Sequence, residues 1–188
     1  MYFRPEAIIR IMLIKRTLLI TVIFLASISI EGYAIKKGVK SMMTITSPAF
    51  QNMETIPVRF SGEGEDLLPP LNFSNIPPST KSLALIIDDP DAPMGTWVHF
   101  VLFNISPKIA GLKEGETPKG AIKGLNSANE LKYHGPYPPP GKAHRYFFSL
   151  YALDITLNLK EGYKKPDVEG AMQGHILSKA ELIGLYKR

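Results

Sequence analysis

The sequence of 188 residues contains no cysteine, which excludes disulfide bonds, thiolate metal sites and a cysteine nucleophile. It also lacks the Gly-x-Ser-x-Gly motif of serine hydrolases and the His-Glu-x-x-His motif of zinc metalloproteases. The formal net charge is +5, yet no run of lysine and arginine is interleaved with aromatic residues. The sequence therefore does not predict a nucleic-acid groove.

The first 34 residues have the order of a secretory signal peptide. A basic start precedes an uncharged, mostly apolar run over residues 18–30, and small residues lie before the expected cleavage site after Ala34. The uncharged span is shorter than the roughly 20 residues of a membrane-spanning helix, so we expect cleavage and no membrane span afterwards. Because the basic stretch is long, Met12 is an alternative start. We expect residues 35–188 to form one exported domain, either periplasmic or secreted.

Two apolar runs separated by an acidic turn form the centre of the sequence. Residues 83–87 and 97–105 are apolar at both alternating sets of positions, which predicts strands buried on both faces. Pro90 and Pro93 lack a backbone N–H, so the chain between the runs must leave the sheet. Three carboxylates therefore lie where the first predicted strand ends, namely Asp88, Asp89 and Asp91.

A second stretch has a similar design. Residues 138–140 are three prolines, and a predicted strand begins shortly after them. Alternation along that strand places His144 and Tyr146 on one face and Arg145 on the other, where we expect a structural ion pair. His99 lies near the start of its own strand in the same way. If the two strands are close neighbours, the imidazoles, the tyrosine hydroxyl and the aspartates converge in one pocket.

The remaining segments carry weaker signals. Residues 55–60 predict a short strand, and residues 106–132 predict a long surface connection because they show no sustained period. Asp167 is expected to cap a short helix near residues 167–175. The pattern of residues 177–188 fits either a helix or a strand.

Four motifs occur in a distinctive order: Asp-Pro-Asp-Ala-Pro at 89–93, Gly-Pro at 135–136, His-Arg-Tyr at 144–146 and Gly-His-Ile-Leu at 174–177. With these motifs the sequence resembles the phosphatidylethanolamine-binding protein family, in its bacterial Raf-kinase-inhibitor-like branch. The resemblance implies a mainly β fold, a sandwich of two antiparallel sheets with one or two short helices. It also implies that residues 177–186 form a closing strand.

The resemblance further implies a small anion pocket at one end of the sandwich. The matching positions are Asp89, Asp91, Pro93, His99, Gly135, His144 and Tyr146. Two imidazoles, a hydroxyl and an exposed backbone N–H at Gly135 can bind the oxygens of a phosphate or phosphoethanolamine head group. Three roles are open for the aspartates: they can hold the imidazoles in donor tautomers, raise the pKa of the imidazoles so that these carry charge, or receive the ammonium group of the ligand. His134 and His175 are interpreted as structural, satisfied core histidines.

Three functions compete. We favour non-catalytic binding of small phosphorylated or anionic ligands, with no cofactor and no metal, and with a regulatory role left open. The first alternative is an inhibitor of a protease or kinase that acts through its surface, with residues 106–132 as the contact. A metal-assisted hydrolase built on His99, His144 and Asp89 is less favoured. The expected partner is a phosphate-bearing small molecule or lipid head group, not nucleic acid, and the sequence leaves a protein partner and a homodimer open.

Overall fold

The structure is a computed structural model that describes residues 42–188. Within this range the chain forms two β-sheets and one α-helix, α2 (Lys165–Met172), together with a short 3-10 helix at Val58–Phe60. The predicted signal peptide, residues 1–34, lies outside the described residues. None of the helices in the described part is both long and apolar enough to cross a membrane.

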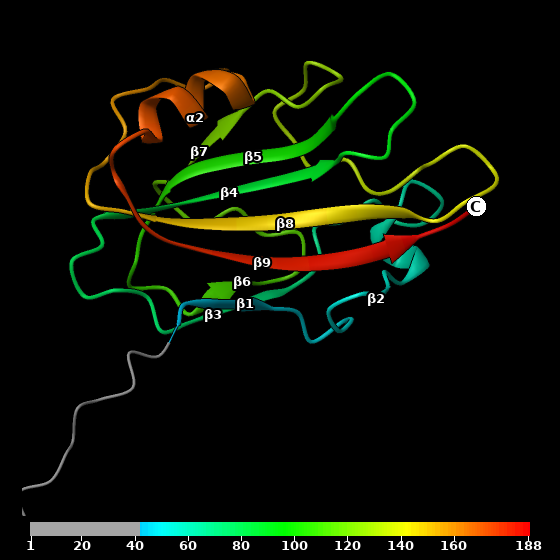
Figure 1. The fold of residues 1–188 in the computed structure, drawn as a ribbon, viewed down its shortest axis with the longest axis horizontal. Helices are drawn as coiled ribbons and strands as arrows, with labels where there is room; N and C mark the ends of the chain where they lie inside the picture. The colour runs from blue at the N-terminus through cyan, green and yellow to red at the C-terminus, as the bar shows by residue number, and fades with distance from the viewer. Residues whose placement is uncertain (1–41) are drawn as a thin grey trace, which may run out of the picture. The chain divides into compact units, whose positions relative to one another are not determined.

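The larger sheet has six strands in the order β2-β9-β8-β4-β5-β7, and the smaller sheet has three in the order β1-β3-β6. Neighbouring strands are antiparallel, apart from the short parallel pair β2–β9. The large sheet consists of β2 (Glu54–Thr55), β4 (Ser82–Asp89), β5 (Trp97–Ile105), β7 (Ile122–Gly124), β8 (His144–Leu153) and β9 (Ile176–Tyr186). The small sheet consists of β1 (Thr44–Thr46), β3 (Leu71–Ser74) and β6 (Gly111–Leu112). In Figure 1 the small sheet and α2 lie on opposite sides of the large sheet.

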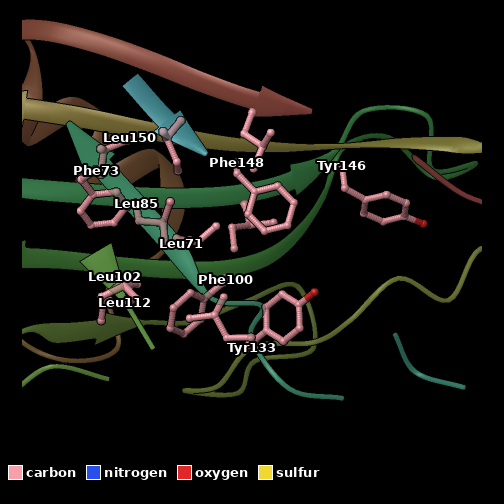
Figure 2. Packing of buried hydrophobic residues seen from close by; sticks show 14 of the residues in the cluster. Leu71, Phe73, Leu85, Phe100, Leu102, Leu112, Tyr133, Tyr146, Phe148 and Leu150 are labelled. Atoms are coloured by element: carbon pink, nitrogen blue, oxygen red, sulfur yellow. The ribbon is translucent and has the colours of Figure 1, made fainter. Parts of the chain in front are cut away.

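Alternate side chains of the central strands enter two different hydrophobic layers. On one face, Leu85 and Phe148 pack with Phe73 of the small sheet (Figure 2). On the other face, Ile86 packs in a second cluster with Val168 of α2. Burying a side chain of this size stabilises the fold by roughly 1.5–3 kcal/mol. The two layers explain why β4 and β5 are apolar at both sets of alternating positions.

The fold predicted from the sequence is confirmed in its main features. Residues 42–188 are mainly β, with two sheets, one short α-helix and one 3-10 turn. The strand predicted over residues 97–105 coincides with β5, and the closing strand is β9. Each lies next to a strand that the local pattern also predicted, β4 and β8 respectively.

Three local predictions need correction. Residues 106–132 are not one loop, because β6 and β7 each add a strand to one of the two sheets. The strand predicted at residues 55–60 is much shorter, because β2 ends at Thr55 and a 3-10 turn follows Pro57. The helix begins earlier than predicted, at Lys165, and Asp167 lies inside its first turn, where its carboxylate accepts the Lys164 N–H at 3.0 Å.

The topology brings the two proline-rich loops to the same end of the sheet. Strand β4 lies between β5 and β8 and runs antiparallel to both, so the end of β4 meets the beginnings of β5 and β8. The register pairs Asp89 with Trp97 on one side and Asp88 with Phe147 on the other. The predicted polar residues therefore gather at one end of the sandwich.

Candidate functional site

A pocket of about 380 Å³ opens where β4 ends and where β5 and β8 begin. Six of the seven residues predicted for the site line it: Asp89, Pro93, His99, Gly135, His144 and Tyr146. Asp91 does not line this pocket. The walls also include residues that the sequence did not assign to the site, among them Met94, Trp97, His134 and Tyr137.

Asp89 and His144 form a hydrogen-bonded pair across the boundary between β4 and β8. The Nδ1–H of His144 donates to Oδ2 of Asp89 at 2.7 Å, and Asp89 is only 3% exposed. Oδ1 of Asp89 accepts the backbone N–H of Asp91 at 2.8 Å. Both carboxylate oxygens are thus engaged within the protein, and Nε2 is the His144 nitrogen left for a ligand.

His99 is held by a backbone carbonyl rather than a carboxylate. Its Nδ1 lies 2.6 Å from the carbonyl oxygen of His134, to which it donates, and the His134 N–H donates back to the His99 carbonyl at 3.0 Å. Burial lowers the pKa of His99, and this effect outweighs the carbonyl hydrogen bond and the charge of Asp89, which both act to raise it. The ring is therefore neutral at pH 7, with a lone pair on Nε2. Of the roles open for the aspartates, a raised pKa does not hold for His99.

Tyr146 places a hydroxyl beside His99. The two rings meet edge to face, with centroids 5.1 Å apart. Figure 2 shows the Tyr146 ring at one end of the apolar cluster, with its hydroxyl directed away from the cluster. That hydroxyl is buried and has no hydrogen-bond partner among residues 42–188. Burial, reinforced by the charge of Asp89, raises the pKa of Tyr146, so the group remains a hydrogen-bond donor.

The expectation that Asp91 faces the pocket needs correction, because its carboxylate binds Arg145. The Arg145 side chain donates to Asp91 at 2.8 and 2.7 Å, and its backbone N–H donates at 3.0 Å. Hydrogen bonding from the Arg145 side chain is the largest effect on the pKa of Asp91 and holds it at about 2. Arg145 is the structural ion-pair partner that the sequence predicted, and Asp91 supports the site through its N–H to Asp89.

Gly135 lines the pocket, but its N–H is not free for a ligand as expected. It donates to Oδ1 of Asp66 at 2.5 Å. A Cβ at position 135 would lie 2.4 Å from the carbonyl oxygen of Phe60, so glycine allows the two backbones to approach closely. No local sequence pattern points to Asp66, which lies 69 positions before Gly135.

Large apolar side chains surround the mouth of the pocket. Met94, Trp97 and Tyr137 are 97%, 40% and 56% exposed, and the Arg188 guanidinium lies 3.9 Å from the centre of the Tyr137 ring. His134 also faces this pocket, and its Nε2 lies 2.5 Å from Glu130. It is thus a partly exposed residue hydrogen-bonded to Glu130 and not the core histidine expected. The sequence signal that could have placed His134 in the pocket is its position directly before Gly135.

A sequence model described as Phosphatidylethanolamine-binding protein matches residues 46–187. The chain belongs to this family. A UPF0098 protein of Methanothermobacter thermautotrophicus is 49% identical over 151 residues, which cover 78% of this chain and 99% of that protein. A UPF0098 protein of Chlamydia muridarum is 45% identical, with the same coverage.

Two solved structures show the fold of the phosphatidylethanolamine-binding protein family. A putative phosphatidylethanolamine-binding protein homologue from Chlamydia trachomatis is 43% identical and superposes with a TM-score of 0.75, covering 78% of this chain and 98% of that one. Escherichia coli YbcL, described as a member of the mammalian family, is 26% identical, with a TM-score of 0.74 over 79% and 99% of the two chains. The family recognised from the four sequence motifs is thereby confirmed.

The pocket of this family member is lined by side chains that can form hydrogen bonds, among them Asp89, His99, His144 and Tyr146. No serine, threonine or cysteine of the described chain lines it. Across residues 42–188, no three histidine, aspartate or glutamate side chains are arranged to hold a metal ion. Within residues 42–188, hydrogen bonds engage the Nδ1 atoms of His99 and His144, and the Tyr146 hydroxyl has no partner. Such an arrangement suits the recognition of a small polar group that accepts and donates hydrogen bonds.

Proposed function

We propose that this protein binds small phosphorylated or anionic ligands, such as phosphoethanolamine-like head groups, without catalysing a reaction on them. The observation that carries the proposal is the buried Tyr146 hydroxyl, which lacks a partner among the described residues and lies beside His99. An unpaired buried hydroxyl costs about 1–3 kcal/mol. A ligand oxygen in the pocket would accept its hydrogen bond and relieve that cost.

The aspartates at this end of the sheet are compatible with an anion. Asp89 is bonded to His144, and Asp91 to Arg145, so neither carboxylate faces the ligand as an isolated charge. Each hydrogen bond to a charged oxygen contributes roughly 1.5–3 kcal/mol, and the loss of ligand freedom on association offsets much of the sum. We therefore expect dissociation constants on the order of millimolar to micromolar.

NMR titration of the protein with phosphoethanolamine and with inorganic phosphate tests the proposal. We expect saturable shifts at residues of the pocket, and their loss in a variant that combines His99→Ala and His144→Ala. His175→Ala is a matched control, because this histidine pairs with Asp154 and is absent from the pocket lining. Absence of shifts at millimolar ligand in the folded protein would refute the proposal. A protein-surface inhibitor of a protease or kinase would then be the next function to test.

We also propose that the protein acts outside the cytoplasm after cleavage behind Ala34. This proposal rests on the order of basic, apolar and small residues in the first 34 positions. N-terminal sequencing of the protein purified from its cells tests it. A mature chain that begins near Ile35 is expected, and a chain that retains Leu18 would contradict cleavage.

A further inference from the structure

The two histidines of the pocket differ in the group that holds Nδ1. Nδ1 of His144 contacts the Asp89 carboxylate, which would compensate a positive charge on that ring. Nδ1 of His99 contacts the uncharged His134 carbonyl, and His99 makes no ion pair within the described residues. Because Nδ1–H is committed to that carbonyl, Nε2 of the neutral His99 ring is a hydrogen-bond acceptor.

An acceptor in an anion pocket requires a ligand that carries a proton. We propose that Nε2 of His99 accepts a hydrogen bond from the phosphate O–H of a phosphate monoester, so that the pocket selects monoesters over phosphodiesters and sulfates. This inference rests on the proposed function, and it narrows the ligand class. A monoester has a second pKa near 6 and so keeps one proton in part at neutral pH. A phosphodiester and a sulfate ester carry no such proton there.

The remaining groups of the pocket fit the other oxygens of the same ligand. The Tyr146 hydroxyl donates, since its buried oxygen has no other partner among residues 42–188. His144 also lines the pocket, and its Nε2 has no protein partner among residues 42–188. Asp89 does not replace His99 as the acceptor, because both of its oxygens already accept hydrogen bonds within the protein. Of the two rings, His99 is the one whose Nδ1 partner carries no charge, so we assign it as the acceptor of the ligand proton.

Proton linkage follows from this arrangement. The titratable groups around His99 come from each neighbouring element: Asp88 and Asp89 at the end of β4, His134 in the loop before β8, and His144 and Tyr146 on β8. Burial lowers the pKa of His99 and so favours its neutral ring, while the monoanion of the ligand becomes more abundant as the pH falls toward 6. Affinity for a monoester should therefore increase as the pH falls from 8 to 6, with proton uptake on binding at pH 7.

Three ligands that share the aminoethyl group test whether the pocket selects a monoester over a diester and a sulfate. They are phosphoethanolamine, which is a monoester, glycerophosphoethanolamine, which is a diester, and 2-aminoethyl hydrogen sulfate. We would titrate each into the full-length protein by NMR at pH 6. Phosphoethanolamine is expected to bind at least about tenfold more tightly than either of the others, since they leave the buried acceptor unpaired. Calorimetry at pH 7 in buffers of different ionisation enthalpy should show proton uptake.

His99→Asn is the variant that isolates the acceptor. The amide of asparagine can keep the donor to the His134 carbonyl but does not reach the position of Nε2. We expect the preference for phosphoethanolamine over the sulfate to fall to within about threefold. His175→Asn, away from the pocket, should retain the full preference. If His99→Asn fails to fold, the comparison of three ligands on the unmodified protein still decides the question.

The outcomes distinguish this inference from the proposed function. Equal affinity for phosphoethanolamine and the sulfate would overturn the inference and leave anion binding intact. Tight binding of the diester would also overturn the inference, because the diester carries no phosphate proton. A preference for phosphoethanolamine that survives in His99→Asn would overturn it too, because the acceptor would then not be His99. If none of the three ligands binds, both the inference and the proposed function fail.

Discussion

Replacing Tyr146 by phenylalanine should make the protein more stable and, at the same time, a weaker binder. The hydroxyl is buried without a partner in the described chain, and an unpaired polar group of this kind costs about 1–3 kcal/mol. Phenylalanine keeps the ring that packs against His99. Using the lower end of that range, we expect a gain of about 1 kcal/mol. For a domain of this size the gain raises Tm by about 2–4 °C.

The effect on ligand affinity has the opposite sign. A hydrogen bond from the hydroxyl to a charged phosphate oxygen contributes roughly 1.5–3 kcal/mol. Its loss should weaken phosphoethanolamine binding by about ten- to a hundredfold. A residue whose removal improves stability and impairs binding is one that the fold retains for its function.

Tyr133→Phe is the matched control. Tyr133 is also a buried tyrosine of the same cluster, but its hydroxyl donates to the carbonyl of Phe60 at 3.0 Å. Removing that donor leaves a buried carbonyl unpaired, so we expect a loss of about 1–2 kcal/mol. Urea unfolding at pH 7 measures both variants, and NMR titration measures affinity. If Tyr146→Phe loses stability as Tyr133→Phe does, or binds phosphoethanolamine as well as the unmodified protein, the reasoning is refuted.

Three further predictions concern His99, Gly135 and Arg145. Burial lowers the folded-state pKa of His99, so stability should decline as the pH falls below about 6.5, where the unfolded state binds a proton that the folded state does not. Urea unfolding over pH 5–7 should show a smaller decline in His99→Asn, and equal slopes would contradict this. Gly135→Ala should lower the free energy of unfolding by about 1–3 kcal/mol, because the added Cβ overpacks against the Phe60 carbonyl. Gly170→Ala is the control: it lies inside α2 with open space around the added Cβ, so it should raise the free energy of unfolding by up to about 1 kcal/mol. Arg145→Met should change the free energy of unfolding by less than about 1 kcal/mol, since its ion pair with Asp91 is partly exposed. The variant should weaken phosphate binding severalfold, because it leaves the Asp91 charge uncompensated. Adding Asp91→Asn removes that charge and should restore binding.

The strands and their convergence could be predicted because local patterns determine them. Strand β5 is apolar at both alternating sets of positions, since small-sheet residues cover one face and α2 covers the other. Prolines after β4 and before β8 interrupt the ladders near one end of the sheet. The pocket residues follow from these two facts, because they are the polar side chains next to the interruptions.

The partners of those side chains could not be predicted in the same way. Asp89 and Asp91 look equivalent in the sequence, but Asp89 is the last residue of β4, whereas Asp91 lies in the turn, where Arg145 binds it. Asp66 reaches Gly135 from 69 positions away, and no local pattern marks such a contact. The pKa of His99 depends on burial and on a carbonyl partner, neither of which is visible in residue types.

The different chemistry of the two histidines originates in the fold. Asp89 lies at the end of the strand between β5 and β8, but its carboxylate is hydrogen-bonded to His144 and not to His99. His99 is left with the carbonyl of His134, and the segment that presents this carbonyl is fixed by Asp66 at Gly135 and by the hydroxyl of Tyr133. Neither of these two anchoring groups belongs to the pocket lining. The position of the carbonyl that holds His99 is therefore set in part by residues outside the pocket lining.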